Sequence, residues 1–194
     1  MRFRKRPFDL TYLKIIFCCL VLSTGICLGS GTWKQLVSDY SITSIQAYDG
    51  GYWFGAGDAG ALRYDNASGE WFRYNKNNGY MNQNHSVNDM KIMHGKVWFA
   101  TNYGMYSCET DGTGWQQHIL PGDYFANWVR GLDANSSHIW IASFSGLYTR
   151  PASGGSFVYQ DISVSGMYGT GIGSSVSAGD SVVWIGTDNG LIRY

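Results

Sequence analysis

The chain has 194 residues, which is long enough for a domain with a sizeable hydrophobic core. Charged residues make up 14% of it, aromatic residues 16%, and 26 residues are Gly. This composition argues against intrinsic disorder and favours strands joined by many turns. The chain has 14 basic and 14 acidic residues, and five of the basic residues but one acidic residue lie within residues 1–30. Residues 31–194 therefore hold 9 basic and 13 acidic residues, a net charge of −4. That charge excludes the basic surface typical of a nucleic-acid-binding protein.

The N-terminus has the layout of a secretory signal peptide. A basic segment, MRFRKR, precedes the apolar run IIFCCLVLSTGICL (Ile15–Leu28), and small residues follow at 29–31. The apolar run has fourteen residues, fewer than the roughly 20 that a membrane-spanning helix needs. We therefore predict a signal peptide at residues 1–30, with an uncleaved N-terminal anchor as the alternative, and a periplasmic or secreted location.

Residues 31–194 contain a fourfold repeat. Its copies are YWFGAGDAGALRY (52–64), VWFATNYGMY (97–106), IWIASFSGLY (139–148) and VWIGTDNGLIRY (183–194). Their Trp residues, at positions 53, 98, 140 and 184, are 45, 42 and 44 residues apart. A strand-rich repeat of this length predicts an all-β fold, a β-propeller in which each repeat forms one four-stranded blade.

The strand that carries each Trp is apolar on both faces. The residues flanking the Trp are Tyr52 and Phe54 in the first repeat and Val183 and Ile185 in the fourth. Because side chains alternate between the faces of a strand, such a strand should be covered on both sides by neighbouring blades. The Gly that follows, as in Asn189-Gly190, predicts a tight turn to the third strand. In the second repeat the expected strands are Val87–Met93, Lys96–Thr101, Gly104–Cys108 and Gly114–His118.

The fourth repeat stops after its third strand, and GTWKQLV (31–37) at the start of the repeat region reads as a spare outer strand. This N-terminal strand could complete the fourth blade and close a four-bladed ring. Alternatively, the four blades are part of a larger propeller. A solenoid that never closes is a third arrangement.

The repeat resembles that of the two-component regulator propellers. The resemblance rests on WIGTDNGLIRY and on three further segments, ITSIQAYDGGYWFGAGDAGALRYD (42–65), SVNDMKIMHGKVWFATNYGMY (86–106) and VRGLDANSSHIWIASFSGLYTR (129–150). It implies an extracytoplasmic sensor, because members of that family build propellers ahead of a membrane helix and a histidine kinase, and some sense glycan fragments. With about four repeats and no kinase, receiver or DNA-binding segment, this sequence resembles the sensor module alone.

No motif for catalysis, for a metal or for another cofactor is evident. The four His residues, at positions 85, 94, 118 and 138, do not have the spacing of metal ligands. The sequence contains no nucleophile elbow and no phosphate-binding loop. We therefore predict a protein that is not an enzyme and needs no cofactor.

The candidate binding residues lie in three long loops, at 75–86, 118–128 and 159–172, and in the turn at Tyr103. In a propeller these segments gather on one face around the central opening. Aromatic rings beside Asn suit sugars, since rings cover the apolar face of a sugar and amides bind its hydroxyls. The predicted ligand-binding residues are Tyr80, Asn84, His85, Tyr103, Tyr124, Asn127, Trp128 and Tyr168. Alternatively, these aromatic residues pack the loops onto the blades.

Three functions follow from this reasoning. The first is a non-catalytic sensor that binds an oligosaccharide or another small ligand. The second is a lyase or hydrolase on a propeller scaffold, which would need acidic, basic or metal-binding residues converging at the opening. The third is a protein-interaction scaffold, or a remnant whose propeller is completed by a protein partner or by self-association.

Overall fold

The computed structural model describes residues 35–36, 40–81, 86–161 and 173–194. Residues Asp39–Tyr194 form one compact unit. The predicted signal peptide or anchor, residues 1–30, lies outside the described residues. In the part of the chain that is described, no helix is long and apolar enough to cross a membrane.

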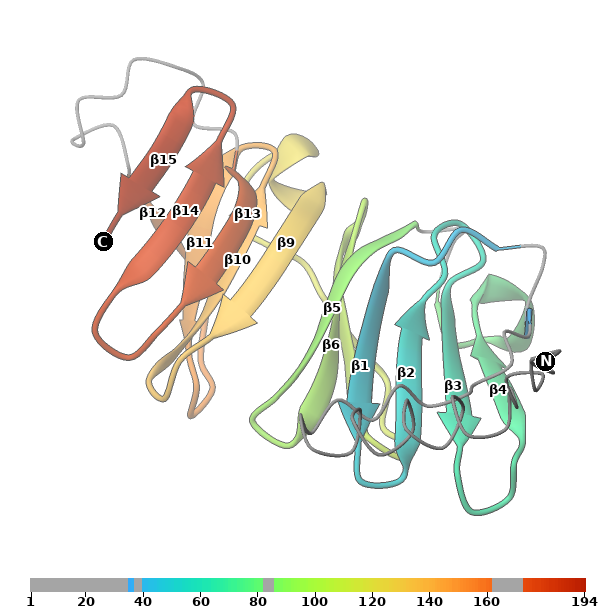
Figure 1. Cartoon of the computed structure of the whole chain (residues 1–194). Coiled ribbons are helices and arrows are strands. Elements are labelled where there is room, and N and C mark those ends of the chain that lie inside the picture. Colours follow the sequence, from blue (N-terminus) through green and yellow to red (C-terminus); the bar gives the residue numbers. More distant parts are fainter. Residues whose placement is uncertain (1–34, 37–39, 82–85, 162–172) are drawn as a thin grey trace, which may run out of the picture. The chain divides into compact units, whose positions relative to one another are not determined.

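The described strands form four antiparallel sheets in chain order, and within each sheet every strand pairs with the next one along the chain (Figure 1). The first sheet is β1 (Ser44–Tyr48), β2 (Gly51–Gly55), β3 (Ala61–Asp65) and β4 (Trp71–Tyr74), and the second is β5 (Val87–Met93), β6 (Lys96–Thr101), β7 (Gly104–Glu109) and β8 (Gln116–His118). The third is β9 (Val129–Ala134), β10 (His138–Ser143), β11 (Gly146–Pro151) and β12 (Val158–Gln160), and the fourth is β13 (Gly173–Ala178), β14 (Val183–Thr187) and β15 (Gly190–Arg193). Two short 3-10 helices, η1 (Lys76–Asn78) and η2 (Phe125–Asn127), follow β4 and β8. The prediction of an all-β fold with one sheet per repeat, and with a fourth sheet of three strands, is confirmed.

The predicted strands of the second repeat agree closely with β5 to β8. β5 and β6 have the expected bounds, β7 is one residue longer than expected, and β8 begins at Gln116 instead of Gly114. Gly112 and Gly114 have φ angles of 89° and 65°. Such left-handed conformations belong to a turn, so the outer strand begins only after them.

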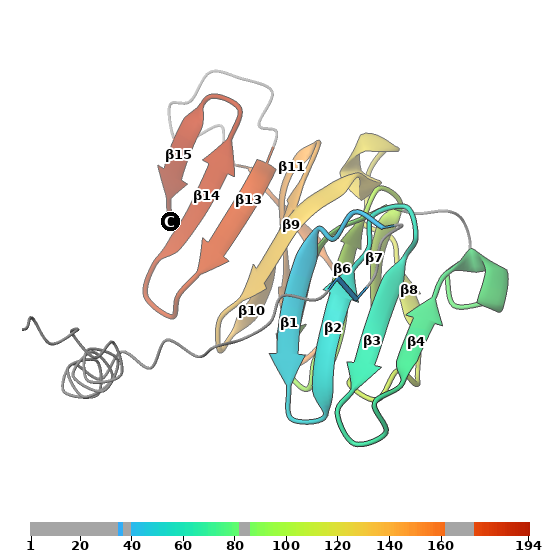
Figure 2. The same cartoon turned by 45° about the vertical axis from the view of Figure 1, so that its right-hand side comes forward.

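Successive sheets contact one another mainly through their first strands. β1 packs on β5, β5 on β9, and β9 on β13. Figure 2 shows β9 beside β13. Hydrogen bonds connect these strands, since Asn88 Nδ2 donates to the Val129 carbonyl at 2.6 Å and the Ala178 N–H donates to Asp133 Oδ2 at 2.9 Å. The first strands therefore hold the sheets together in the manner of neighbouring propeller blades.

The first three Trp residues of the repeat each lie in a hydrophobic core between their own sheet and the next. The exposed fractions of Trp53, Trp98 and Trp140 are 0%, 4% and 6%. Their partners are the apolar residues that flank the following Trp, namely Val97 and Phe99, Ile139 and Ile141, and Val183 and Ile185. Coverage of the Trp strand on both sides is thus confirmed for β6 and β10.

The same prediction is wrong for the outward sides of the first and fourth sheets. Trp184 in β14 is 43% exposed, and Tyr52 in β2 is exposed as well. The reason is that β1 packs on β5 and β13 packs on β9, which leaves the opposite side of each end sheet without a neighbouring sheet among the described residues. A four-bladed ring closed within Asp39–Tyr194 would bury both side chains, so the described sheets form an open series. The proposed closing strand, residues 31–37, lies mostly outside the described residues, and Gln35 and Leu36 are not in a strand.

The Gly after each Trp strand forms the predicted tight turn. Gly104, Gly146 and Gly190 begin the third strands of their sheets with φ angles of 85°, 133° and 129°. At Gly104 a Cβ atom would also lie only 2.4 Å from the His118 carbonyl oxygen. Backbone conformation and close approach therefore both require Gly at this position.

Candidate functional site

Of the eight predicted ligand-binding residues, Asn84, His85 and Tyr168 lie outside the described residues. Tyr80 and Tyr103 are described and partly exposed. The Tyr80 ring leans against Tyr74 and Trp115, with ring centroids 4.9 Å and 5.8 Å apart. Tyr80 thus contacts rings from the first and second repeats and keeps an exposed side, so it remains a predicted binding residue.

Asn127 is buried and holds the loop between β8 and β9. Its Oδ1 accepts a hydrogen bond from the Leu120 N–H at 2.7 Å. Its Nδ2 donates to the carbonyls of Leu120 and Asp123 at 3.2 Å and 3.4 Å. Since these contacts occupy the amide, we leave Asn127 out of the candidate site.

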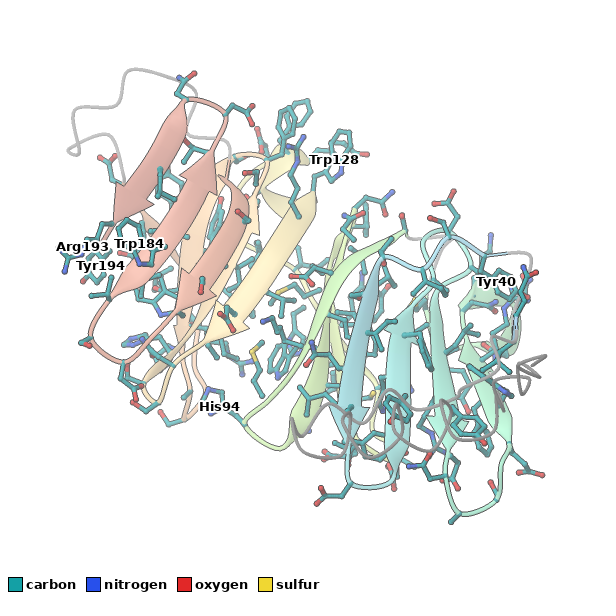
Figure 3. All side chains as sticks on the ribbon, in the orientation of Figure 1. Tyr40, His94, Trp128, Trp184, Arg193 and Tyr194 are labelled. Carbon is teal, nitrogen blue, oxygen red and sulfur yellow. The ribbon has the colours of Figure 1, made fainter. Side chains whose placement is uncertain are left out.

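Tyr124 and Trp128 belong to one aromatic cluster beside the start of β9, where Figure 3 labels Trp128. Phe125 stacks on Phe144 at 5.2 Å, and Trp128 stacks on the same ring at 5.3 Å. The Arg130 guanidinium lies 5.1 Å from the Phe144 centroid. Tyr124 joins the cluster through Phe125, with ring centroids 5.6 Å apart, and both of these side chains remain exposed.

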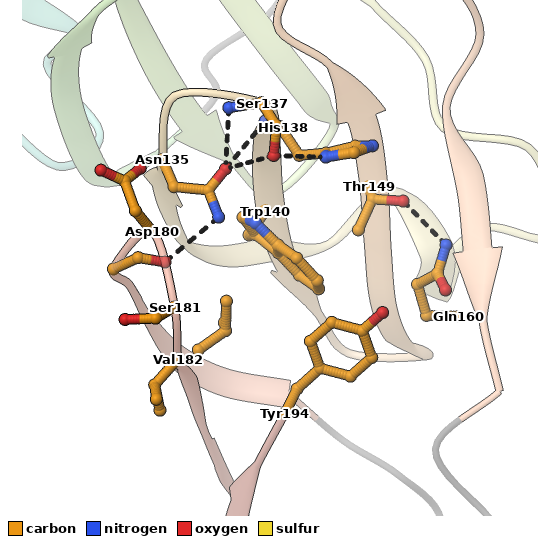
Figure 4. Close-up of a pocket in the computed structure, with 12 residues that line it drawn as sticks. Asn135, Ser137, His138, Trp140, Thr149, Gln160, Asp180, Ser181, Val182 and Tyr194 are labelled. Carbon is orange, nitrogen blue, oxygen red and sulfur yellow. Dashed lines mark hydrogen bonds between the residues drawn. The ribbon is translucent and has the colours of Figure 1, made fainter.

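A better-defined hollow lies between the third and fourth sheets, and we call it the Trp140 cleft (Figure 4). Its volume is about 360 Å³. Hydroxyl, amide and aromatic side chains from both sheets surround it. The lining residues are Asn135, Ser137, His138, Trp140, Thr149, Gln160, Gly179, Asp180, Ser181, Val182, Val183 and Tyr194.

The floor of the cleft contains a hydrogen-bond donor without an acceptor. Trp140 Nε1 is buried and has no partner among the described residues. Figure 4 shows the nitrogen side of the indole directed toward Asn135 and His138. By contrast, Trp53 Nε1 donates to the Thr110 carbonyl at 3.0 Å, in the turn between the third and fourth strands of the next sheet.

The indole of Trp98 also has a buried N–H without a partner among the described residues. It lines a smaller hollow of about 200 Å³ between the second and third sheets. There the His118 ring stacks on the indole at 4.8 Å, and the Arg150 guanidinium lies 5.4 Å from its centroid. Because these side chains cover the Trp98 ring, the larger Trp140 cleft is the stronger candidate site.

The turn between β9 and β10 forms a firmly held rim. Asn135 Oδ1 accepts hydrogen bonds from the Ser137 N–H at 3.1 Å and the His138 N–H at 2.9 Å. Asn135 Nδ2 donates across the cleft to the Gly179 carbonyl at 3.2 Å. The side chains of Ser137 and His138 bond to each other at 2.9 Å. This rim is thus tied to both sheets before any ligand arrives.

The remaining walls combine an aromatic ring, an amide and a carboxylate. The Tyr194 ring lies 5.2 Å from the Trp140 ring, and Gln160 Nε2 donates to Thr149 Oγ1 at 2.7 Å. Asp180 accepts the Ser136 N–H at 2.9 Å. The pKa of Asp180 lies below its usual range, mainly because the Ser136 main chain donates a hydrogen bond to the carboxylate and secondly because the Ser136 side chain does so. The cleft therefore offers one carboxylate among hydroxyl, amide and aromatic groups.

Trp140 was expected to be purely structural, and neither His138 nor Asp180 was among the predicted binding residues. No signal in the sequence marks the unpaired N–H of Trp140, because Trp98 faces a sheet of four strands and its N–H also has no partner among the described residues. Across the described residues, no three His, Cys, Asp or Glu side chains gather as metal ligands would.

Comparisons with known proteins bear on the fold. The structure is similar to the computationally designed Ika4 protein, with a TM-score of 0.64, 14% identity and coverage of 86% of this chain and 98% of that one. It is similar to the extracellular domain of the putative hybrid two component system BT3049 from B. thetaiotaomicron, with a TM-score of 0.64, 18% identity and coverage of 84% and 22%. It is also similar to the β-propeller domain of Cps50 (Swd1) from Myceliophteria thermophila, with a TM-score of 0.53, 12% identity and coverage of 76% and 49%.

These likenesses establish a propeller-like fold. The chain spans about a fifth of the length of the BT3049 extracellular domain. No family model matches the sequence. No curated protein matches it either.

Proposed function

We propose that this protein is a non-catalytic sensor propeller, related to the sensor parts of two-component regulators, which acts outside the cytoplasm. Its ligand is an oligosaccharide fragment or a similar neutral molecule rich in hydroxyl groups, bound in the Trp140 cleft. The observation that carries this proposal is the buried Trp140 Nε1–H without an acceptor at the floor of that cleft.

The chemistry of the cleft suits such a ligand. A buried N–H without a partner costs about 1–3 kcal/mol, so a ligand oxygen that reaches Trp140 Nε1 when the side chains around it shift would recover that free energy. The rings of Trp140 and Tyr194 offer apolar surface, and Asn135 and Gln160 offer amides at the rim. A sugar presents both an apolar face and hydroxyl groups, which matches this combination.

The charges around the cleft favour binding over hydrolysis. A glycoside hydrolase uses a pair of carboxyl groups on either side of the bond that it cleaves. In the described lining, Asp180 is the one acidic residue, and its lowered pKa keeps it ionised. This arrangement supports a site that recognises a ligand without transforming it.

The location outside the cytoplasm rests on two supports. One is the similarity to an extracellular domain of a two component system. The other is the pattern of residues 1–30, in which a basic segment precedes a fourteen-residue apolar run. Mass spectrometry of the exported protein tests this directly, since cleavage near residue 30 gives a mature chain that begins close to Gly31.

The ligand proposal is tested by following the indole N–H signals of the protein in ¹H–¹⁵N NMR spectra during titration with neutral oligosaccharides. We expect the Trp140 signal to shift most. We also expect Trp140→Phe to weaken binding at least about tenfold, because it removes one hydrogen bond of about 1.4 kcal/mol.

Trp128→Phe is the matched control, because Trp128 lies in the aromatic cluster outside the cleft and its loss should leave the affinity unchanged. If Trp128→Phe abolishes binding and Trp140→Phe does not, the loop residues predicted from the sequence form the site instead. Conversion of the oligosaccharide during the titration would contradict the non-catalytic proposal.

A further inference from the structure

The two end sheets expose faces that are buried everywhere else in the repeat. The outward face of the first sheet carries Ile45, Tyr52 and Trp71, all of which are exposed. The outward face of the fourth sheet carries Trp184 and Leu191, which are 43% and 64% exposed. We call these the front face and the back face.

The front face is a continuous aromatic surface. The Tyr52 and Phe54 rings lie 6.3 Å apart, Phe54 lies 5.3 Å from Trp71, and Tyr64 lies 5.0 Å from Trp71. Strand pairing puts these side chains on one face, because Tyr52 is opposite Tyr64, and Tyr64 is opposite Trp71. Contiguous apolar surface of this kind marks an interaction site.

The back face has the side chains that cover the next sheet elsewhere in the chain. Trp184 occupies the position of Trp53, Trp98 and Trp140, and Figure 3 shows Trp184 on the fourth sheet near Arg193, whose guanidinium lies 6.0 Å from the indole. Leu191 pairs with Gly186 just as Met105 pairs with Ala100 and Leu147 with Ala142. Met105 and Leu147 are buried, so Leu191 lacks only its neighbouring sheet.

We propose that the back face of one copy of this chain docks on the front face of a second copy, and thereby repeats the contact that joins successive sheets within the chain. The contact occurs three times within the chain, between the first and second, the second and third, and the third and fourth sheets. In each copy, the front face and the back face of the described sheets are the two surfaces of this contact that have no partner sheet. A second copy supplies both missing partners in the register that the sequence already encodes.

The register predicts which residues meet. Within the chain each buried Trp lies near one matching residue of the next sheet. These residues are Cys108, which belongs to the same core cluster as Trp53, Arg150 over Trp98 at 5.4 Å, and Tyr194 beside Trp140 at 5.2 Å. The equivalent position in the first sheet is Tyr64, so Trp184 should meet Tyr64 and Tyr52 of the second copy. Because the two faces differ, the contact is head-to-tail, and copies add until the last back face meets the first front face.

The test is sedimentation velocity of the unmodified protein from about 1 µM to about 100 µM, together with two variants, Trp184→Glu on the back face and Tyr52→Glu on the front face. We expect the unmodified protein to associate with rising concentration. Each variant should weaken association at least about 30-fold, as expected for a buried aromatic residue at the centre of an interface. Ile119→Glu is the matched control, because Ile119 is also exposed and lies on neither end sheet.

An equal mixture of the two variants gives the sharpest result. The Trp184→Glu chain keeps its front face and the Tyr52→Glu chain keeps its back face, so the mixture should form a heterodimer although each variant alone stays monomeric. Failure of the mixture to associate would overturn head-to-tail docking. An unmodified protein that stays monomeric throughout would overturn the proposal as a whole. If the unmodified protein stays monomeric and the Trp184→Glu variant melts at a lower temperature than it, another part of the same chain covers the back face.

Discussion

Replacing Trp53 and Trp140 by Phe should have different effects on stability, although both residues occupy the same position of the repeat and both are buried. Trp53→Phe removes the hydrogen bond from Nε1 to the Thr110 carbonyl, a loss of about 1 kcal/mol. Trp140→Phe removes an N–H that has no partner among the described residues. Loss of this unpaired donor should stabilise the protein by about 1–3 kcal/mol. The loss of ring volume opposes stability in both variants. We therefore expect Trp53→Phe to be more destabilising than Trp140→Phe by roughly 2–4 kcal/mol.

Urea denaturation without ligand measures the two free energies of unfolding. Trp53 also packs against Tyr74 and Phe99, at 5.0 Å and 5.6 Å, so its packing loss could exceed that of Trp140. Benzothienylalanine keeps the two fused rings of Trp and replaces the N–H by sulfur. Its incorporation at position 53 or 140 therefore preserves the ring packing and tests the hydrogen bond alone. It should destabilise the protein at position 53 and stabilise it at position 140. Equal effects of the isostere at both positions would refute the assignment of an unpaired donor beneath the cleft.

Three further predictions concern the surrounding framework. Burial, followed by the charges of Arg150 and Lys96, lowers the pKa of His118 to about 4. The unfolded chain takes up that proton near pH 6.5, so the contribution of His118 to stability is complete above that pH and decreases as the pH drops toward 4. Because the ring is partly open to solvent, which screens its interactions, we expect a loss of about 1 kcal/mol. Melting curves at several pH values should show that His118→Gln largely abolishes this loss. Gly104→Ala should destabilise the protein by at least about 1 kcal/mol more than Gly79→Ala. Both residues have nearly the same φ, 85° and 84°, but a Cβ at Gly79 meets nothing within 4 Å. Equal losses of unfolding free energy in urea denaturation would show that the clash at Gly104 is relieved. Asn127→Ala should cost about 2 kcal/mol of stability and leave oligosaccharide affinity unchanged, whereas a loss of affinity in a stably folded variant would return Asn127 to the binding site.

The repeating strands and turns could be predicted because their causes are local. Alternation of apolar side chains around each Trp marks the second strand, and the Gly at positions 104, 146 and 190 provides the left-handed backbone that the following turn needs. A residue and its neighbours suffice for both signals. The bounds of β5 and β6 follow from them without error.

The coverage of each face and the position of the cleft depend on residues distant in the sequence. Trp140 and Trp184 have nearly identical surroundings along the chain, yet one is buried and the other exposed, because burial requires a sheet more than forty residues away. Likewise, Trp53 Nε1 finds its acceptor 57 residues further on, whereas Trp140 Nε1 finds none among the described residues. The sequence by itself thus determined the blades and their turns. The tertiary structure alone decided which indoles are left without a partner and which faces stay open, because both are properties of the space between two sheets.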